Sequence, residues 1–314
     1  MTKNLPNNIY LVDKLITLNG LNVISGQSNA GKSWVVLDIA KAIATGSDLW
    51  GKFPTIQSNV LIIDGESGER EMKRRTTLMG FDHSLPISFL QMQEIKIDDK
   101  NTVKSLIEEA KNRDVKFIIL DPFSAMHTKQ ENSAEEMQKV MEGLTELTKE
   151  GITVLFVHHH RKTNGNNGSV QMDNLRGSSV IVTRVDSQIY LKKEVEADSF
   201  VEICLSIEKL RNGKKINPFN LMLIDDEEGI RLNYSGENET KKLKREQAEE
   251  LITDYLESGA RKTSEIIEML KQNDIAKRTG DEAFKQLKLK GTISYEKVGK
   301  EYVYSLTEIG ATVQ

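Results

Sequence analysis

Short, almost continuously apolar runs recur along the first half of the chain, at residues 21–25, 59–63, 116–120 and 152–157. Runs of this length without polar alternation are typical of parallel strands that are covered on both faces. The segments between them place apolar residues at helical spacing, as residues 34–44 do. Strands that alternate with helices predict right-handed β-α-β crossovers and an α/β fold with a doubly wound, mostly parallel twisted sheet.

The clearest helix is predicted to begin at Ser133, because Ser133 and Glu136 have the spacing of a capping box. Its apolar stripe consists of Met137, Val140, Met141, Leu144 and Leu147. From about residue 186 the pattern changes to alternation, in the runs 188–191, 200–210, 221–224 and 229–232. These runs predict antiparallel strands that complete the sheet of a first domain, residues 1–235.

A polar stretch without a core pattern, residues 236–244, predicts a linker. Beyond it, residues 245–314 read as a small separate domain. Its pattern is three helices and then two alternating strands around residues 298–300, with a second capping box at Thr279 and Glu282. Three helices followed by a β-hairpin predict a winged-helix-like arrangement.

A complete phosphate-binding loop lies between the first apolar run and the first helix, and reads Gly26-Gln27-Ser28-Asn29-Ala30-Gly31-Lys32-Ser33, followed by Trp34. Two glycines allow the backbone to wrap around phosphate oxygens, and the helix N-terminus adds its partial positive charge. Lys32 can reach the β- and γ-phosphates, and the Ser33 hydroxyl can ligate Mg²⁺. This stretch predicts a binding site for ATP and Mg²⁺ that extends to Trp34.

Two acidic positions follow predicted strands and suit ATP hydrolysis. Asp121 is predicted to hold the magnesium from the end of its buried strand, although an aspartate there can also cap the next turn. Glu66 is the candidate general base that polarises the attacking water. Asp64 competes for that role, and an acid at the start of the next helix would equally explain Glu66.

Three consecutive histidines, His158 to His160, end the last parallel strand. Neighbouring residues on a strand point to opposite faces, so the three cannot converge on one tetrahedral zinc ion. We expect His158 or His159 to sense the γ-phosphate instead, and a solvated histidine run is the alternative. The glycine- and asparagine-rich loop that follows begins with Arg161 and Lys162, and is predicted either to bind a nucleic-acid backbone or to be a surface loop without a partner.

The bulk properties narrow the choice of partner and compartment. A formal net charge of −4 over 314 residues argues against a uniformly basic coat, so any nucleic-acid contact is expected at local basic loops or in a central channel. The single cysteine, Cys204, excludes an internal disulfide and suits a reducing compartment. No run approaches the length of a membrane span, and a cytoplasmic location without membrane contact is expected.

The ordered set of the phosphate loop, Asp64-Gly65-Glu66, Leu120-Asp121, the histidine run and Leu175-Arg176-Gly177-Ser178-Ser179 resembles the RecA-like hexameric ATPases. Within them it is most similar to the RepA-like plasmid and phage replicative helicases, over roughly residues 10–233. The resemblance implies that Glu66 and Lys32 serve catalysis and that His158 or His159 senses the phosphate. It also implies a hexameric ring whose loop, through Arg176, faces single-stranded DNA in a central channel.

In such rings the resemblance also implies a cation from the neighbouring subunit that completes each ATP site. The matching strand end carries Lys192 and Lys193 where the helicases usually have arginine, and Arg184 is the competing candidate. In the small domain, Lys285 and Lys288 lie on the side of the third helix expected to be exposed. Because that domain is nearly neutral, DNA reading and protein docking both remain open.

Three functions are compatible with the sequence. An ATP-dependent DNA motor of the replicative-helicase type comes first. A RecA-like recombination or helicase-loading ATPase, or an ATP-gated DNA-binding regulator, would contain the same core.

Overall fold

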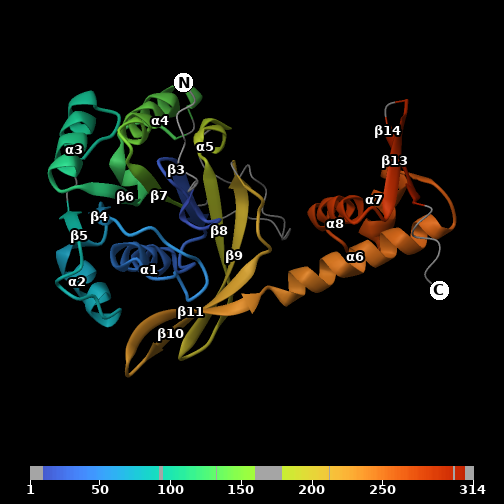
Figure 1. The fold of residues 1–314 in the computed structure, drawn as a ribbon, viewed down its shortest axis with the longest axis horizontal. Helices are drawn as coiled ribbons and strands as arrows, with labels where there is room; N and C mark the ends of the chain where they lie inside the picture. The colour runs from blue at the N-terminus through green and yellow to red at the C-terminus, as the bar shows by residue number, and fades with distance from the viewer. Residues whose placement is uncertain are drawn as a thin grey trace, which may run out of the picture. The chain divides into compact units, whose positions relative to one another are not determined.

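The computed structural model describes residues 10–91, 95–131, 133–159, 179–211, 213–299 and 301–307. The chain divides into two compact units, one containing most of the chain up to Gly236 and the other containing the chain from Glu237 onward. Figure 1 shows both units.

The described part of the first unit is built on a nine-stranded sheet of order β11-β10-β9-β8-β3-β7-β6-β4-β5. The strands are β3 (Leu21–Gly26), β4 (Asn59–Asp64), β5 (Ile87–Gln91), β6 (Val115–Asp121), β7 (Thr153–His159), β8 (Ser187–Glu196), β9 (Phe200–Leu210), β10 (Phe219–Asp226) and β11 (Gly229–Glu237). The pairs from β5 to β8 are parallel, whereas β8 with β9 and β9 with β10 are antiparallel. The predicted mostly parallel α/β sheet is therefore confirmed.

One strand differs from the sequence-based expectation. β8 was expected to begin the antiparallel part, but it runs parallel to β3 and pairs Asn22 with Ser187. The direction reverses one strand later, at the turn between β8 and β9. Polar residues occur in β8 because its carboxyl half, residues 192–196, is largely exposed. Such a pattern reflects burial and does not determine whether the strand runs parallel or antiparallel to its neighbours.

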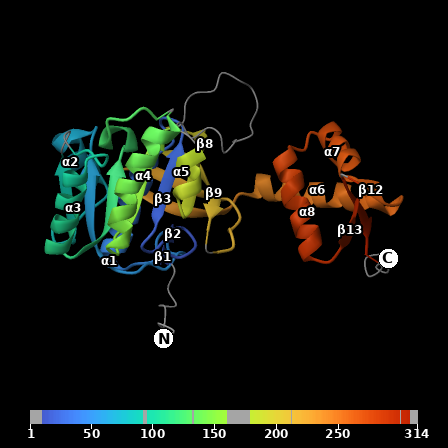
Figure 2. The same cartoon turned by 90° about the horizontal axis from the view of Figure 1, so that it is seen from above.

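Helices cover both faces of the sheet (Figures 1 and 2). They are α1 (Lys32–Thr45) and α2 (Gly68–Leu78) on one face, and α3 (Lys100–Asn112), α4 (Ala134–Lys149) and α5 (Ser179–Arg184) on the other. Alternate strand residues divide between the two layers. Val60 and Ile62 pack in the α1 layer, and Leu61 and Ile63 pack in the α3–α4 layer, as a strand period of two requires.

The helix termini follow the capping chemistry of the sequence. Ser133 accepts a hydrogen bond from the Glu136 amide at 3.3 Å, which confirms it as the N-cap of α4. The Glu136 carboxylate instead accepts from the amide of Gln130. α3 has the same kind of cap, because Asp99 accepts from the amide of Thr102. The short elements of this unit are β1 (Tyr10–Val12), β2 (Ile16–Thr17) and the 3₁₀ turn η1 (Phe123–Met126).

The second unit has its own core. It consists of α6 (Glu239–Glu257), β12 (Arg261–Lys262), α7 (Thr263–Gln272), α8 (Lys277–Leu289), β13 (Ile293–Val298) and β14 (Glu301–Leu306). The three strands form a sheet of order β12-β14-β13 within the described residues. Ala283, Phe284 and Leu287 of α8 are buried, as the apolar stripe predicts.

Two boundaries in this unit differ from expectation. The predicted linker, residues 236–244, is the end of β11 followed by the first turns of α6. The charged residues there lack an apolar stripe, which hides a helix from pattern analysis. α8 begins at Lys277 after Ala276, so Thr279 and Glu282 lie inside the helix and form no capping box.

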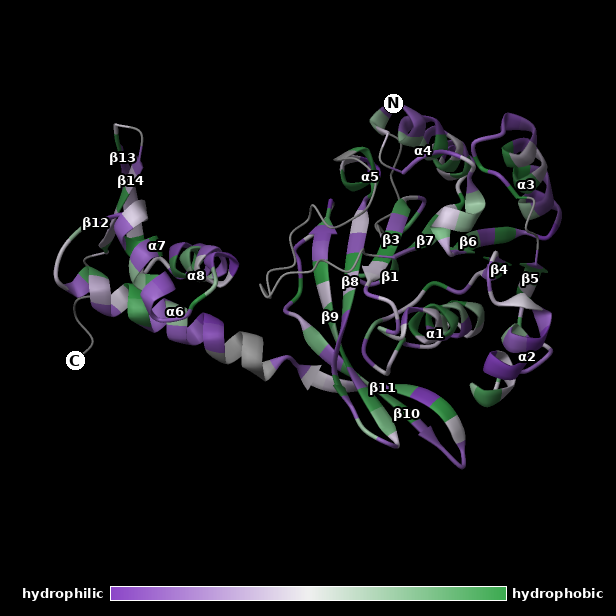
Figure 3. Ribbon diagram, turned by 180° about the vertical axis from the view of Figure 1, so that it is seen from behind, coloured by the Kyte–Doolittle hydropathy of each residue, from purple (hydrophilic) through white to green (hydrophobic). Residues whose placement is uncertain are grey.

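Hydropathy follows these layers. Apolar residues run along the central strands β6 and β7, whereas α2 is largely hydrophilic (Figure 3). Within the described ranges no helix combines the length and the apolar character needed to cross a bilayer.

Candidate functional site

The phosphate-binding loop connects the carboxyl end of β3 to the first turn of α1. Gly26 lies against β8, so a Cβ atom there would come within 2.4 Å of the Leu191 carbonyl oxygen. Gly31 has a φ of 76°, and a Cβ atom would come within 2.5 Å of Ile203 Cδ1. Each glycine is therefore required by the backbone path, independently of any ligand.

Lys32 lies within this loop. It is 5% exposed, and its Nζ donates to the carbonyl oxygens of Gly26 at 3.1 Å and Gln27 at 2.7 Å. Burial lowers its pKa to about 8, an effect partly opposed by the carboxylates of Asp121 and Glu66. A partly desolvated ammonium held in the phosphate-binding loop is suited to binding an anion.

Ser33 and Asp121 meet although the chain separates them widely. The Ser33 hydroxyl hydrogen-bonds the Asp121 carboxyl group, and burial raises the pKa of that group to about 6. The neighbouring Asp64 raises this pKa further, while Ser33, Arg75 and Lys32 lower it. A hydroxyl and a carboxylate in contact form a donor set of the kind that suits Mg²⁺, so these residues fit the ion predicted for them.

Asp64 caps the turn that leads into α2. Its carboxylate accepts from the amides of Glu66 at 3.3 Å, Ser67 at 3.1 Å and Gly68 at 3.0 Å. These bonds engage both carboxylate oxygens, which favours a structural role for Asp64. The exposed side chain of Glu66, by contrast, lines the same cavity as the phosphate loop.

The histidines lie on β7, between the strand of the phosphate loop and the strand of Asp121. His159 lines the cavity, and burial followed by the charge of Lys32 lowers its pKa. His158 points to the other face, where it is 3% exposed, packs on Phe123 and lies 3.7 Å from Glu131. Of the two alternatives for the phosphate sensor, His158 or His159, only His159 lines the cavity, because neighbouring strand residues point to opposite faces. His160 lies outside the described residues.

Together these elements enclose a cavity of about 570 Å³. The loop contributes residues 29–34, and β4, β6 and β7 contribute Asp64, Asp121 and His159. Strands β8, β9 and β10 form a further wall with Glu196, Val201 and Leu223. The sequence had assigned these three residues no function, and they carry no motif that could have signalled one.

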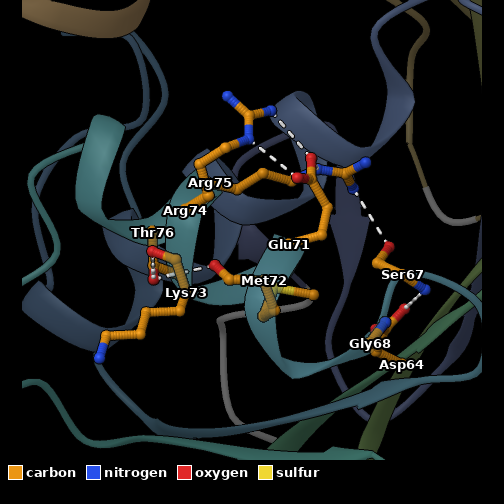
Figure 4. Close-up of polar contacts among 9 residues, drawn as sticks. All are labelled: Asp64, Ser67, Gly68, Glu71, Met72, Lys73, Arg74, Arg75 and Thr76. Atoms are coloured by element: carbon orange, nitrogen blue, oxygen red, sulfur yellow. Dashed lines mark hydrogen bonds and ion pairs between the residues drawn. The ribbon is translucent and has the colours of Figure 1, made fainter.

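Arg75 and Ser67 are the other lining residues that sequence reasoning missed. Arg75 reaches the cavity from α2, and Figure 4 shows its contacts with Glu71 and Ser67. Hydrogen bonds from Arg74 and then Arg75 lower the pKa of Glu71 to about 2. In the sequence, only the spacing of Glu71 and Arg75 by one helical turn could have pointed to Arg75. Such pairs are common on exposed helices, so the spacing does not indicate a functional site.

The remaining predicted residues lie apart from this cavity or outside the description. Lys192 pairs with Glu194 at 2.7 Å and Lys193 pairs with Glu196 at 2.5 Å. Neither lysine, nor Arg184 at the end of α5, lines the cavity of this single chain. Arg161, Lys162 and Arg176 lie outside the described residues. In the part of the chain that the structure describes, no group of three or more acidic, histidine or cysteine side chains is suited to hold a metal.

In the second unit, Lys285 and Lys288 are exposed on α8. Lys288 is directed over the hairpin, where its Nζ lies 4.2 Å from the Tyr295 ring centroid and 3.1 Å from the Tyr304 hydroxyl. Tyr295 and Tyr302 are 54% and 44% exposed, and their rings meet edge to face. A basic and aromatic surface therefore extends from α8 onto the hairpin.

Comparison with known proteins agrees with this geometry. A protein-family model described as an AAA domain matches residues 2–165, just over half of the chain. The chain belongs to this AAA domain family. The matched range contains the phosphate loop, Glu66, Asp121 and His159, so most of the cavity wall belongs to the AAA domain.

A solved structure gives the fold. The chain is similar to a structure titled as a DnaB-like replicative helicase and its interactions with primase, with a TM-score of 0.53 and 15% sequence identity. The alignment covers 68% of this chain and 57% of that one, so the chain spans less than two thirds of its neighbour. The AAA domain here therefore has a RecA-like P-loop core. No match was found among curated protein sequences.

Proposed function

We propose that this protein is an ATP-dependent DNA motor of the replicative-helicase type, with a RepA-like organisation. The observation that carries the proposal is the single cavity in which the phosphate loop, the Ser33–Asp121 pair, Glu66 and His159 converge. A phosphate loop alone supports binding. A general base, a metal-holding acid and a histidine facing the same space support hydrolysis.

The residues divide the chemistry among them. The loop amides and Lys32 hold the triphosphate, while Ser33 and Asp121 hold Mg²⁺. Bound magnesium would offset charge on the phosphate oxygens. Glu66 accepts a proton from the attacking water, because its carboxylate lines the cavity and is free of the amide bonds that engage Asp64. His159 lies on β7, between β3 of the phosphate loop and β6 of Asp121. It is suited to sense whether the γ-phosphate is present and to pass that signal to the chain that follows β7.

A ring would complete the site. A cation of the neighbouring subunit, Lys192, Lys193 or Arg184, would stabilise the transition-state charge from outside this cavity. Arg161, Lys162 and Arg176 would contact single-stranded DNA in the channel, with a change of grip coupled to the nucleotide state.

The second unit is proposed to be a winged-helix-like DNA-binding domain. The order of its helices and strands, and the surface formed by Lys285, Lys288, Tyr295 and Tyr302, support this assignment. Lysines would contact phosphates, and exposed tyrosines can stack on bases.

The deciding experiment measures the ATPase rate with and without single-stranded DNA, alongside the oligomer mass by light scattering and unwinding of a forked duplex. A motor shows DNA-stimulated hydrolysis, a ring-sized mass and unwinding. DNA-stimulated hydrolysis without unwinding favours the recombination or helicase-loading alternative. A footprint at one sequence without unwinding favours the ATP-gated regulator, and the absence of ATP binding refutes all three.

A further inference from the structure

Arg75, on α2, brings a positive charge to the proposed nucleotide cavity. No function was assigned to α2 from the sequence. Its side chain is 22% exposed, and its Nε donates to Glu71 Oε1 at 2.8 Å. Its Nη1 donates to the Ser67 hydroxyl at 3.3 Å (Figure 4). The guanidinium is thus held by its own helix on one side and contacts the preceding turn on the other.

That turn carries Glu66. The amides of Glu66 and Ser67 both donate to Asp64, so the main chain of the turn is fixed to the end of β4. Ser67 is the position where this fixed turn also receives a side-chain contact from α2. Glu66 directly precedes it, so the contact with Arg75 acts on the peptide unit next to the proposed base.

Arg74 is a natural comparison for Arg75. Both arginines donate to Glu71 at 2.8 Å, and their guanidinium carbons lie 5.9 Å and 5.7 Å from the Trp34 ring centroid. Arg75 alone of the two lines the cavity, contacts Ser67 and acts electrostatically on Asp121. Both side chains therefore contact Glu71 and approach Trp34, and only Arg75 of the two also contacts Ser67 and lines the cavity.

We propose that Arg75 is a positioning residue of the nucleotide site, which acts through Ser67 to hold the turn that carries Glu66. This inference rests on the proposed ATPase function and names a residue of the same site. A fixed base accelerates proton transfer because the geometry of attack is set before the reaction. Arginine suits the task because its planar fork contacts Glu71 and Ser67 at once, which a lysine ammonium cannot reproduce.

The test is a double-mutant cycle on the full chain, with kcat, KM and the Kd for ATP measured for each variant. Arg75→Ala is expected to lower kcat about tenfold or more, with the Kd for ATP changed less than about threefold. Ser67→Ala should lower kcat by a smaller factor, and the double variant should be no slower than Arg75→Ala. Arg75→Lys should recover little of the lost rate, and Arg74→Ala should match the wild type. Thermal unfolding verifies that each variant is folded, and Arg75→Gln replaces Arg75→Ala if that variant is not.

Three results would overturn the inference. One is an Arg75→Ala rate equal to that of Arg74→Ala. A second is a loss of ATP affinity as large as the loss of kcat/KM, which would make Arg75 a direct ligand of the nucleotide. The third is a loss of kcat in the double variant that equals the product of the losses in Arg75→Ala and Ser67→Ala, because the two residues would then act independently. Failure of the proposed function looks different, since the wild type would then not hydrolyse ATP or Glu66→Gln would retain full turnover.

Discussion

Asp64 and Asp121 occupy paired positions at the carboxyl ends of β4 and β6, yet their carboxylates do different things. Asp64 accepts from amides of the turn that follows it, and Asp121 contacts the Ser33 hydroxyl across the cavity. Both acids end an apolar strand, but the groups opposite them differ, which gives Asp64 a structural contact and leaves Asp121 for the proposed metal-holding role.

Asp121→Asn is expected to make the nucleotide-free chain more stable near neutral pH. The folded pKa of Asp121 is raised from 3.8 to about 6 by burial, so the folded chain binds this proton more tightly than the unfolded chain. The free energy of unfolding therefore falls as the pH rises from about 4 to about 6, and the asparagine removes that loss, at most about 3 kcal/mol.

Urea unfolding at pH 4.5 and pH 7.5, without nucleotide and magnesium, measures this effect. The stability difference between Asp121→Asn and the wild type should grow with pH, while ATP turnover is lost. An identical pH dependence in both proteins would show that Asp121 titrates normally.

Glu66→Gln should abolish turnover and leave ATP binding intact, since the amide cannot accept the proton of the water. A loss of about 10²- to 10⁴-fold is expected for removal of a general base. Asp64→Asn is the informative partner, because it weakens the cap of the α2 turn while the base remains. Asp64→Asn is expected to lower the unfolding temperature and to reduce the ATPase rate less than Glu66→Gln does. A larger reduction than that of Glu66→Gln would assign the general base to Asp64.

His159→Ala and His158→Ala should separate catalysis from packing. His159 faces the cavity, so its removal is expected to lower DNA-stimulated turnover about tenfold or more with little change in stability. His158 is buried against Phe123, so its removal should cost about 2 kcal/mol of folding free energy. Chemical denaturation and ATPase assays of both variants decide the matter, and the reverse pattern would place the sensor at His158.

Much of this site could be predicted from the sequence, because its signals are local. The phosphate loop, the apolar strand before Asp121 and the Ser133 cap each depend on residues close together in the chain. The side of β7 that faces the cavity could not be predicted, since it depends on which helices cover each face of the sheet and on the order of the strands. Arg75 was missed for a similar reason, because its helix position suggests a surface ion pair, and only the fold brings the α2 turn to the cavity.

Gly31→Ala should remove nucleotide binding and destabilise the chain. The residue has a φ of 76° and a Cβ atom would lie 2.5 Å from Ile203 Cδ1, so the substitution adds both backbone strain and a clash. A cost of about 1–3 kcal/mol is expected. Gly51→Ala is a matched control, because it has a φ of 65° and open space around its Cβ position. Equal losses in the two variants would mean that the strain alone matters, without the close approach of β9.

Simultaneous replacement of Lys285 and Lys288 by glutamine tests what the second unit binds. Both lysines lie three residues apart on the exposed side of α8, and Lys288 continues the surface onto Tyr295. If that surface binds duplex DNA, each lost phosphate contact lowers the salt slope of the affinity by about 0.9, so the double variant should lose up to about 2. Lys271→Gln, on α7, is the control for net charge. An unchanged slope in the double variant, with DNA still bound by the full chain, would assign this surface to protein docking and leave DNA contact to the first unit.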